Sequence, residues 1–525
     1  MPGKRLRQSV KQKKTNRVIN VGEWIEKWST IQPEKEALIY EGRSFSYLQF
    51  SERINRFCNA LLAMNVEKGD RIALLLYNSN QYLEAYFAIS RIGAIAVPLN
   101  YRLAAPELEY LLNDCGAESL ILDEEFVPTV AKLRPRIPVK RGHYLGVGNA
   151  LPQWAKSLEA AAAGHSSEAP RFSWDVGEED AHVIMYTSGT TGLPKGAVLP
   201  HRKTFYNCLN ADIFFELEPN NTMLIVIPLF HSAGLFITAS SMYYRGGTVV
   251  LHRRFDPGRV MEDIQRYRVN KFLAITTMYN FILQQPNLED YDISSLETCY
   301  IGGERVPPSL IQAYREHGLV LRQVFGLTET SILLWTKGQD VIRKPGTVGK
   351  PVFHGEIRLV DPEGRDVRIG EVGEIVARGP ILMKGYWNSP ELTNQTIRDG
   401  WLHTGDSARM DEEGCFYIVD REKDMYISGG ENVYPAEIEK IYAAHPKVFE
   451  VAVIGVPDEK WGQVGKVFIV PKKGVSMTEE EAIRYCEDKL ARYKIPRSCQ
   501  FMDALPKTET GKIRKSALKE IVQKS

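Results

Sequence analysis

The sequence lacks the features of a secreted, zinc-binding or nucleic-acid-binding protein. Its seven cysteines are scattered and include no Cys-x-x-Cys pair, so we expect neither a disulfide framework nor a zinc site. Its 66 Lys and Arg residues are balanced by 65 Asp and Glu residues, which removes any overall attraction to nucleic acid. No apolar segment follows the N-terminal charges, so no secretory signal is predicted. Together these absences favour a protein of the reducing cytoplasm.

One long stretch lacks charge. Residues 222–244 contain no Lys, Arg, Asp or Glu and are long enough to cross a membrane. Pro228, His231 and Gly234 interrupt this stretch, which divides into a strand at Leu224–Ile227, a loop and an amphipathic segment. We therefore predict buried core here rather than a membrane helix.

The N-terminal tail lacks acids. Residues 1–17 contain no Asp or Glu and seven basic residues, which are Lys4, Arg5, Arg7, Lys11, Lys13, Lys14 and Arg17. A charge run of this kind is usually a solvated, disordered tail, which we place at residues 1–20. Its alternative role is peripheral attraction to the anionic inner face of a membrane, at about 1 kcal/mol per basic residue near the surface.

A chain of 525 residues is too long for one ordinary core, so two or more domains are expected. From Val21 onward, short apolar runs alternate with helical patterns, which indicates α/β layers with mostly parallel sheets. The expected strands are 71–77, 119–122, 248–251 and 272–275, and the expected helices are 81–92, 260–267 and 309–317. After about Ile357, short strands broken by Gly and Asp predict an antiparallel or barrel-like end to a large N-terminal domain, residues 21–420.

A smaller α+β domain of about 105 residues is expected at 421–525. Val451–Ile454 and Val467–Val470 predict strands, and Thr478–Ala491 predicts a helix that is opened by a Thr cap and a Glu cluster. The predicted fold class is therefore α/β, with a large multi-layer N-terminal domain and a small C-terminal domain.

The most informative segment is Tyr186–Gly196, with the sequence Tyr-Thr-Ser-Gly-Thr-Thr-Gly-Leu-Pro-Lys-Gly. It follows the apolar run Val183–Met185, so a strand is expected to lead into a glycine-rich loop. Glycines allow backbone N–H groups to approach an anion, hydroxyls donate further hydrogen bonds, and Lys195 adds a positive charge. The Walker pattern is absent, because it needs Gly-Lys-Ser/Thr. The segment predicts a phosphate cradle, with a plain polar surface loop as the alternative.

The full segment resembles the nucleotide-binding signature of the adenylate-forming superfamily, which contains acyl-CoA synthetases, peptide-synthetase adenylation domains and beetle luciferases. Further motifs follow in the family's order, and the resemblance extends from about Val21 to Val522. It implies a two-step reaction that uses ATP, Mg²⁺ and CoA, with a mobile C-terminal domain. In the cradle, it implies ATP contacts for Thr187, Ser188, Gly189, Thr190, Thr191, Gly192 and Lys195.

Two further segments resemble the family's adenine and phosphate contacts. Residues 300–304, Tyr-Ile-Gly-Gly-Glu, predict a strand that ends in a glycine turn. The resemblance places this turn beside the adenine and the acyl pocket, although its last residue departs from the small residue usual there. The predicted contacts are Gly302, Gly303 and Glu304. Residues 325–329, Phe-Gly-Leu-Thr-Glu, can stack an aromatic ring on adenine, place a hydroxyl near the α-phosphate and hold Mg²⁺ with a carboxylate. These roles fall to Phe325, Gly326, Thr328 and Glu329.

The remaining motifs join the two domains. Asp406, in Trp-Leu-His-Thr-Gly-Asp, resembles the aspartate that accepts two hydrogen bonds from the ribose diol, and Arg421 is expected at the same ribose. Lys423 matches the family's hinge, about which the small domain rotates. Lys512, in Thr-Gly-Lys-Ile, corresponds to the lysine that neutralises charge during adenylation.

Two adjacent glycines, Gly429 and Gly430, leave room over the backbone. In acyl-CoA synthetases this segment lines the pantetheine tunnel of CoA, and Trp461 resembles one of its walls. The alternative for the two glycines is a hairpin turn.

The acyl pocket is expected around residues 227–234 and the residues after the Thr-Glu motif. Small and apolar side chains dominate there, and the pocket residues are predicted to be Phe230, His231, Ala233, Ile332 and Leu333. The histidine either gates the pocket, with a catalytic role, or is a hydrogen-bonded core residue. An apolar pocket with few polar anchors favours long chains at about 0.8 kcal/mol per CH₂.

The segments 102–107 and 490–494 look most like bacterial fatty acyl-CoA synthetases, so a medium- or long-chain fatty acid is the first expected substrate. An aromatic acid of the coumarate, ferulate or benzoate kind is the second. A luciferase-like or carrier-charging enzyme is a third possibility, against which the presumed CoA tunnel argues. A non-enzymatic adaptor for membranes or nucleic acid would require decayed motifs, and the motifs look intact. The sequence leaves a homodimer open.

Overall fold

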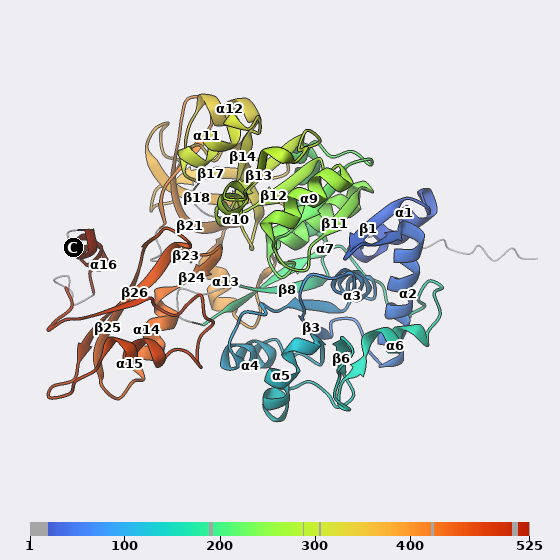
Figure 1. Cartoon of the computed structure of the whole chain (residues 1–525), viewed down its shortest axis with the longest axis horizontal. Coiled ribbons are helices and arrows are strands. Elements are labelled where there is room, and N and C mark those ends of the chain that lie inside the picture. The colour runs from blue at the N-terminus through green and yellow to red at the C-terminus, as the bar shows by residue number, and fades with distance from the viewer. Residues whose placement is uncertain are drawn as a thin grey trace, which may run out of the picture.

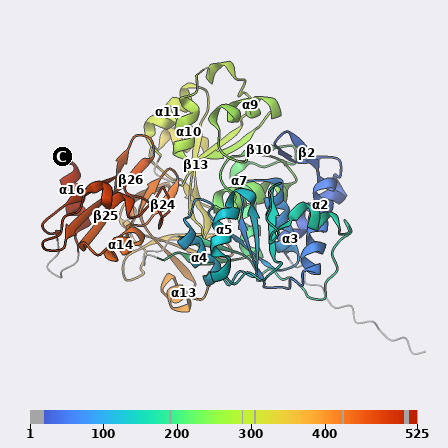
Figure 2. The same cartoon turned by 60° about the horizontal axis from the view of Figure 1, so that its bottom comes forward.

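The computed structural model describes residues 19–187, 193–286, 288–303, 306–421, 425–506 and 513–523, with only the backbone of Asp420, Arg421 and Ala436. Within these residues the chain forms a large domain of two mostly parallel sheets and one antiparallel sheet, followed by a smaller domain on a fourth sheet. The small domain, orange and red in Figures 1 and 2, lies at the end of the molecule opposite α1 and α2. The predicted basic tail falls outside the described residues, except for its last two positions.

The first sheet has eight strands in the order β19-β9-β8-β4-β3-β5-β6-β7. Its strands are β3 (Arg71–Leu75), β4 (Ile95–Pro98), β5 (Ser119–Asp123), β6 (Tyr144–Val147), β7 (Lys156–Ser157), β8 (Ala181–Thr187), β9 (Lys195–Pro200) and β19 (Gly385–Tyr386). The strands from β8 through β4, β3, β5 and β6 to β7 run parallel, and β9 returns antiparallel to β8. The predicted phosphate cradle therefore connects two neighbouring strands at one edge of this sheet.

The second sheet has nine strands in the order β16-β15-β14-β13-β12-β10-β11-β1-β2. Its strands are β1 (Glu36–Tyr40), β2 (Arg43–Ser46), β10 (Thr222–Ile225), β11 (Thr248–Leu251), β12 (Lys271–Ala274), β13 (Thr298–Gly302), β14 (Leu321–Leu327), β15 (Ser331–Trp335) and β16 (Lys350–Pro351). The six central strands of this sheet are parallel and mostly buried, as continuous apolar runs predict; in sheet order they are β14, β13, β12, β10, β11 and β1. The predicted motifs at 300–304 and 325–329 lie at the carboxyl ends of two adjacent strands of this sheet.

Helices cover and separate the sheets. They are α1 (Trp24–Ile31), α2 (Tyr47–Ala63), α3 (Asn80–Arg91), α4 (Ala105–Asp114), α5 (Val127–Leu133), α6 (Leu158–Ala163), α7 (His201–Phe215), α8 (Ser241–Arg245), α9 (Pro257–Tyr267), α10 (Thr276–Leu283), α11 (Pro308–Glu316), α12 (Gly338–Arg343) and α13 (Pro390–Thr396). Short 3₁₀ turns are η1 (Val21–Glu23), η2 (Glu124–Phe126), η3 (Arg134–Arg136) and η5 (Leu288–Asp290), and η4 (Ala233–Ser240) is a π-helical segment. The buried helix α3 contacts β4 and β8 of the first sheet, and its rings meet those of η4 and α8.

The third and fourth sheets are mainly antiparallel. The third comprises β17 (Glu356–Val360), β18 (Val372–Arg378), β20 (Ile397–Arg398), β21 (Trp401–Met410) and β22 (Phe416–Arg421). The fourth comprises β23 (Tyr426–Ser428), β24 (Glu431–Val433), β25 (Val448–Asp458), β26 (Gly462–Pro471) and β27 (Ser498–Phe501). It is flanked by α14 (Pro435–Ala443), α15 (Glu479–Arg484) and α16 (Lys515–Gln523). The predicted α/β fold class is confirmed.

Two expectations about single segments can be compared with the structure. The predicted helix Thr478–Ala491 is too long, because α15 ends at Arg484 and tight turns follow, with the N–H of Cys486 donating to the carbonyl of Ile483. The uncharged stretch 222–244 forms β10, η4 and α8 in the core, as predicted. Among the described residues, no helix is long and apolar enough to span a membrane.

All seven cysteines are free thiols, and only Cys499 is more than slightly exposed. Burial raises the pKa of five of these thiols to about 12, namely Cys58, Cys115, Cys208, Cys299 and Cys499. The expected absence of a disulfide framework agrees with this arrangement, and the cysteines have the character of small core residues.

Candidate active site

A cavity of about 310 Å³ opens where the first two sheets, the third sheet and the small domain meet. Most of the predicted site residues that the structure describes line this cavity. They are Thr187, Lys195, Gly302, Gly303, Phe325, Gly326, Thr328, Glu329, Asp406 and Gly430, together with Phe230, His231, Ala233 and Ile332. Segments spread over more than 240 residues of sequence are thus brought together, as the order of the motifs predicts.

Other predicted residues lie elsewhere. Leu333 is fully buried but is not part of the cavity wall. Gly429 and Trp461 also lie outside the wall. The predictions for Ser188, Gly189, Thr190, Thr191, Gly192, Glu304, Lys423 and Lys512 concern positions outside the described residues, and only the backbone of Arg421 is described.

Glu329 is held at the cavity wall by three neighbouring side chains. Its Oε1 accepts a hydrogen bond of 2.8 Å from the hydroxyl of Tyr386 and lies 3.9 Å from Nζ of Lys195. Thr187 Oγ1 lies 3.5 Å from the same oxygen. Burial and the neighbouring Glu329 charge raise the pKa of Tyr386, so this hydroxyl stays a donor. The carboxylate and the lysine of the predicted cradle therefore meet at one point of the wall.

A Mg²⁺ site of this kind needs one or two carboxylates, because the substrate phosphates and water supply the other ligands. Glu329 is only 7% exposed, yet it lines the cavity and is ringed by oxygen and nitrogen donors. The described residues contain no cluster of three or more candidate metal ligands. The site thus fits a Mg²⁺ ion that arrives with a nucleotide and is shared with it.

Asp406 lies on β21, directly opposite Arg421 of β22 in the antiparallel register. It is 4% exposed and lines the cavity, and the hydroxyl of Thr404 accepts a hydrogen bond of 3.1 Å from its backbone N–H. The two residues predicted to share a ribose are therefore cross-strand neighbours, which is a relationship that sequence separation alone does not reveal.

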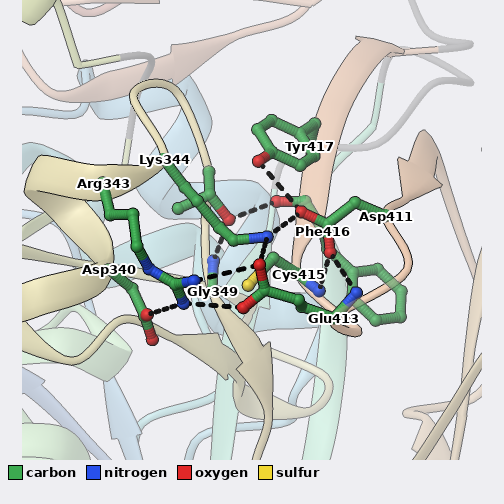
Figure 3. A network of polar contacts seen from close by, with 10 residues as sticks. Asp340, Arg343, Lys344, Gly349, Asp411, Glu413, Cys415, Phe416 and Tyr417 are labelled. Carbon is green, nitrogen blue, oxygen red and sulfur yellow. Dashed lines mark hydrogen bonds and ion pairs between the residues drawn. The ribbon is translucent and has the colours of Figure 1, made fainter.

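The turn of the β21–β22 hairpin is tied to the end of α12 by the polar network of Figure 3. Nζ of Lys344 bonds to Asp411 at 2.5 Å and to Glu413 at 3.0 Å, and Arg343 bonds to Glu413 at 2.7 Å. The hydroxyl of Tyr417 donates to Asp411 at 3.2 Å. Although burial acts in the opposite direction, the hydrogen bond from Lys344 lowers the pKa of Asp411 to about 2. The network anchors the hairpin that carries Asp406.

The two predicted tunnel glycines form the turn between β23 and β24, which is the hairpin-turn alternative. Both have positive φ, +58° for Gly429 and +83° for Gly430, as a two-residue hairpin turn requires. A Cβ on Gly430 would lie 2.1 Å from Cδ1 of Ile275, and one on Gly429 would lie 2.9 Å from the ring of Trp461. The turn packs tightly between Ile275 of the large domain and Trp461.

Glu431 follows this turn and points into the large domain. Its side chain is buried, and its oxygens contact Arg102, His231 at 3.0 Å and Asn100 at 3.3 Å. Burial alone would raise the pKa of Glu431, but the charges and hydrogen bonds of His231 and Arg102 lower it to about 2. His231, expected either to gate the pocket or to be a hydrogen-bonded core residue, thus has a hydrogen-bond partner that the sequence analysis did not identify.

A second contact joins the two segments that the sequence analysis singled out together, 102–107 and 490–494. Glu107 of α4 accepts bonds of 2.7 Å from Nζ of Lys494 and of 2.8 Å from the backbone N–H of Ala491. Lys494 also lies 2.7 Å from Glu437 and is 3% exposed. In both views α4 faces β24 and α14 of the small domain (Figures 1 and 2).

The sequence analysis missed Tyr386, Glu431 and Arg102 as parts of the site. Tyr386 belongs to a two-residue strand that pairs with β9, and its local sequence carries no signal. Glu431 stands directly after the glycine pair, so an acid beside a predicted tunnel was the available signal for it.

The chain is similar to known proteins over almost its whole length. The profile described as AMP-binding enzyme matches residues 25–387, and that of the AMP-binding enzyme C-terminal domain matches residues 437–512. A feruloyl-CoA synthase of Amycolatopsis sp. is 41% identical over 95% of this chain and 98% of its own. A long-chain-fatty-acid–CoA ligase of Mycobacterium tuberculosis is 34% identical, with the same coverage.

Among solved structures, an o-succinylbenzoate CoA synthetase from Bacillus subtilis, bound to a product analogue, superimposes with a TM-score of 0.85. It is 31% identical and the match covers 95% of this chain and 98% of that one. The family profile covers well over half of the chain, and the relatives extend over nearly all of it. The chain belongs to the AMP-binding enzyme family, and within it to the acid–CoA ligases that use ATP, CoA and Mg²⁺ and release AMP.

Proposed function

We propose that this enzyme forms CoA thioesters of aromatic carboxylic acids, of the arylpropenoate kind, by way of an acyl-adenylate. The observation that carries the choice of acid is the feruloyl-CoA synthase, which at 41% identity is nearer to this chain than the fatty-acid ligase at 34%. The ligand named for the B. subtilis structure is also derived from an aromatic acid. We therefore place aromatic acids ahead of the fatty acids that the sequence analysis favoured.

The cavity wall is consistent with a flat, apolar acyl group. Beside the Thr-Glu motif, its apolar part comprises Ile227, Phe230, Ala233, Ile237, Leu273 and Ile332. Pockets of this type hold a ligand by burying its surface and discriminate through a few polar groups. An aromatic ring can lie among these side chains with its carboxylate directed to Thr328.

In the first step, a carboxylate oxygen of the acid attacks the α-phosphorus of ATP and pyrophosphate leaves. We assign phosphate binding to Thr187, Lys195 and Thr328, and charge neutralisation at the α-phosphate to Lys512. Glu329 would hold Mg²⁺, which when bound supplies positive charge to the departing phosphates. Tyr386 positions the Glu329 carboxylate through its 2.8 Å hydrogen bond.

We assign the remaining nucleotide contacts to the predicted residues. Asp406 and Arg421 would bind the ribose hydroxyls from adjacent strands, and Phe325 would stack on the adenine. The turn at Gly302 and Gly303 would border the adenine and the acyl group.

In the second step, the thiol of CoA attacks the acyl carbon and AMP leaves. We assign the pantetheine channel to Gly429, Gly430 and Trp461, and the hinge to Lys423 at the boundary between domains 21–420 and 421–525. The small domain contributes its β23–β24 turn to the cavity, whereas no described residue of α16, which begins three residues after Lys512, lines it. We therefore assign the observed orientation to thioester formation, with rotation delivering Lys512 for adenylation.

A fatty acid is the second candidate substrate, because the wall offers a long apolar surface and a fatty-acid ligase is among the relatives. Peripheral membrane association through the basic tail stays a prediction. It would support this candidate if liposome binding were salt-sensitive and were lost on deletion of residues 1–17.

The decisive experiment measures AMP formation that requires both ATP and CoA, across acids from acetate to palmitate, with benzoate, 4-coumarate and ferulate included. We expect the highest kcat/KM with a 4-coumarate or ferulate type of acid. A maximum among saturated fatty acids would replace the first candidate with the second and leave the nucleotide assignments unchanged.

A further inference from the structure

Lys203 is a buried cation beside the cavity that none of the assigned roles uses. It lies in the first turn of α7, is 1% exposed and donates a hydrogen bond to Oγ of Ser331. Its Nζ is 5.7 Å from the ring centre of Phe236. Within the described residues Lys203 forms no ion pair, and burial lowers its pKa to about 7. The charge of Glu329 acts in the opposite direction, but it forms no direct pair with Lys203. Burying an ammonium group without a paired carboxylate is costly, so its position calls for a reason.

Ser331 connects this cation to the cavity. It is the first residue of β15 and lines the cavity, whereas Lys203 does not reach the wall. Its φ of +61° is unusual for a residue other than glycine. Strained backbone of this kind is concentrated at functional sites.

Ser331 lies on the apolar, acyl side of the cavity. The next residue, Ile332, belongs to the apolar wall, and α7 and β15 both pack against η4. From η4, Ala233 and Ile237 face the same cavity, and Phe236 lies beside the lysine. The hydroxyl of Ser331 is thus a polar point within a largely apolar surface.

The direction of the Lys203–Ser331 bond determines what Ser331 can offer. An ammonium group has only donors, so Oγ of Ser331 accepts and its own hydrogen must point elsewhere. Within the described residues the Ser331 hydroxyl has no second hydrogen-bond partner, and Ser331 is part of the cavity wall. The positive charge behind the oxygen also makes the hydroxyl a stronger donor.

We propose that Lys203 and Ser331 form a polar anchor that selects acids carrying a neutral oxygen acceptor on the acyl group, such as a ring hydroxyl or methoxy oxygen. This inference rests on the proposed function and narrows its substrate class. Ser331 donates the hydrogen bond to the substrate, and Lys203 is a positioning residue that orients and polarises Ser331. An unsubstituted ring or a saturated chain would leave this buried donor unpaired, which costs binding.

The geometry favours a neutral oxygen over a second carboxylate. The ammonium group remains behind Ser331 and offers no direct contact to an anion in the cavity. One hydroxyl hydrogen matches one acceptor lone pair, as in a phenol or an aryl ether, whereas a buried carboxylate needs several donors or a cation.

The test compares kcat/KM for ferulate and 4-coumarate with that for cinnamate, which lacks a ring oxygen. We expect the native enzyme to prefer the oxygenated acids by at least ~10-fold, mainly through KM. Ser331→Gly removes the donor and suits the positive φ, and it should reduce this preference ~10-fold. Lys203→Met should reduce it in the same direction, and the double variant should add little, because both changes disable one donor.

Lys271 offers a matched control, since it is also 1% exposed but pairs with Glu297 at 3.0 Å away from the anchor. Lys271→Met should lower thermal stability without changing the preference. A native preference near one, or the same preference in Ser331→Gly, would overturn the anchor. If Lys203→Met does not fold, Ser331→Gly alone decides. A lack of CoA-dependent AMP release with every acid would instead overturn the proposed function.

Discussion

Oε1 of Glu431 lies 3.0 Å from Nε2 of His231, so a carboxylate of the small domain is hydrogen-bonded to a side chain of the large domain. The same carboxylate contacts Arg102 and is largely withdrawn from water. Glu431, Arg102 and His231 thus form a specific contact between the two domains, which we call the latch. Because His231 and Glu431 both line the cavity, the position of the small domain affects the shape of the cavity wall.

Glu431→Gln should weaken this latch, because the amide keeps the shape but removes the charge that Arg102 and His231 compensate. We expect thioester formation from supplied acyl-adenylate to slow ~10-fold or more, while pyrophosphate release in the first step changes little. Single-turnover rates of the two steps measure this. Glu459→Gln, which removes an exposed charge from the same domain, is the control. Equal slowing of both steps would argue against an orientation-specific latch.

Lys512→Ala should abolish adenylation, with a loss of ~100-fold or more, because one buried electrostatic contact to a transition state typically has this effect. Thioester formation from supplied acyl-adenylate should be spared, since α16 lines no part of the cavity in the observed orientation. Lys519→Ala, an exposed lysine of the same helix, serves as the control. If both partial reactions fell together, Lys512 would not have the assigned role.

Gly430→Ala should impair thioester formation and leave adenylation nearly intact. The new Cβ would meet Ile275 at 2.1 Å, so the β23–β24 turn would have to withdraw from the large domain. Gly474→Ala provides a matched control, because Gly474 also has a positive φ but has nothing within 4 Å of its Cβ position. Rates of thioester formation that fall equally in both variants would indicate backbone strain instead of a steric effect at the domain interface.

The buried histidine pair predicts acid sensitivity. His182 and His201 stack with ring centres 4.5 Å apart, and burial lowers the pKa of His201 to about 3, below its unfolded value of about 6.5. Between these values the unfolded chain binds more protons, so stability is complete above pH 6.5 and falls as pH falls. For His201 the loss is about 2 kcal/mol between pH 6.5 and 5.

The melting temperature measured from pH 7.5 to 5 at constant ionic strength tests this expectation. His201→Asn keeps an acceptor for the 3.2 Å hydrogen bond from the N–H of Val21 but cannot titrate. It should remove about half of the slope, and the rest should come from His182, whose pKa is lowered in the same direction. A flat profile in the native protein would show that the pair titrates normally.

The local sequence pattern was sufficient to predict those elements whose ends do not depend on contacts with distant residues. Thr248–Leu251 coincides with β11, because a short, mostly apolar run is typical of a strand that a parallel sheet buries on both faces. The helix expected at 478–491 ends at Arg484, and the last residue of the expected range, Ala491, donates its N–H to Glu107 of the other domain. The sequence pattern of the small domain alone does not indicate this contact with Glu107.

The residues of the site also fall into two groups, those that sequence motifs predicted and those that only the fold reveals. Glu329 and Asp406 were predicted through motifs that resemble those of the adenylate-forming superfamily, and both line the cavity. Tyr386 and Ser331 act through positions that the fold creates, one by a two-residue strand pairing and the other by a positive φ. Such residues become visible only when distant segments are placed side by side.

The seven free cysteines have a practical consequence for every assay proposed above. Six are buried, and burial raises the pKa of all seven thiols above its ordinary value, so each favours the thiol over the thiolate. Because reagents such as aromatic disulfides react with accessible thiolates, the folded enzyme should contribute little colour to a thiol titration. The thiol of CoA would then be the main reactive species in the cuvette, and its consumption could be followed continuously without coupling enzymes.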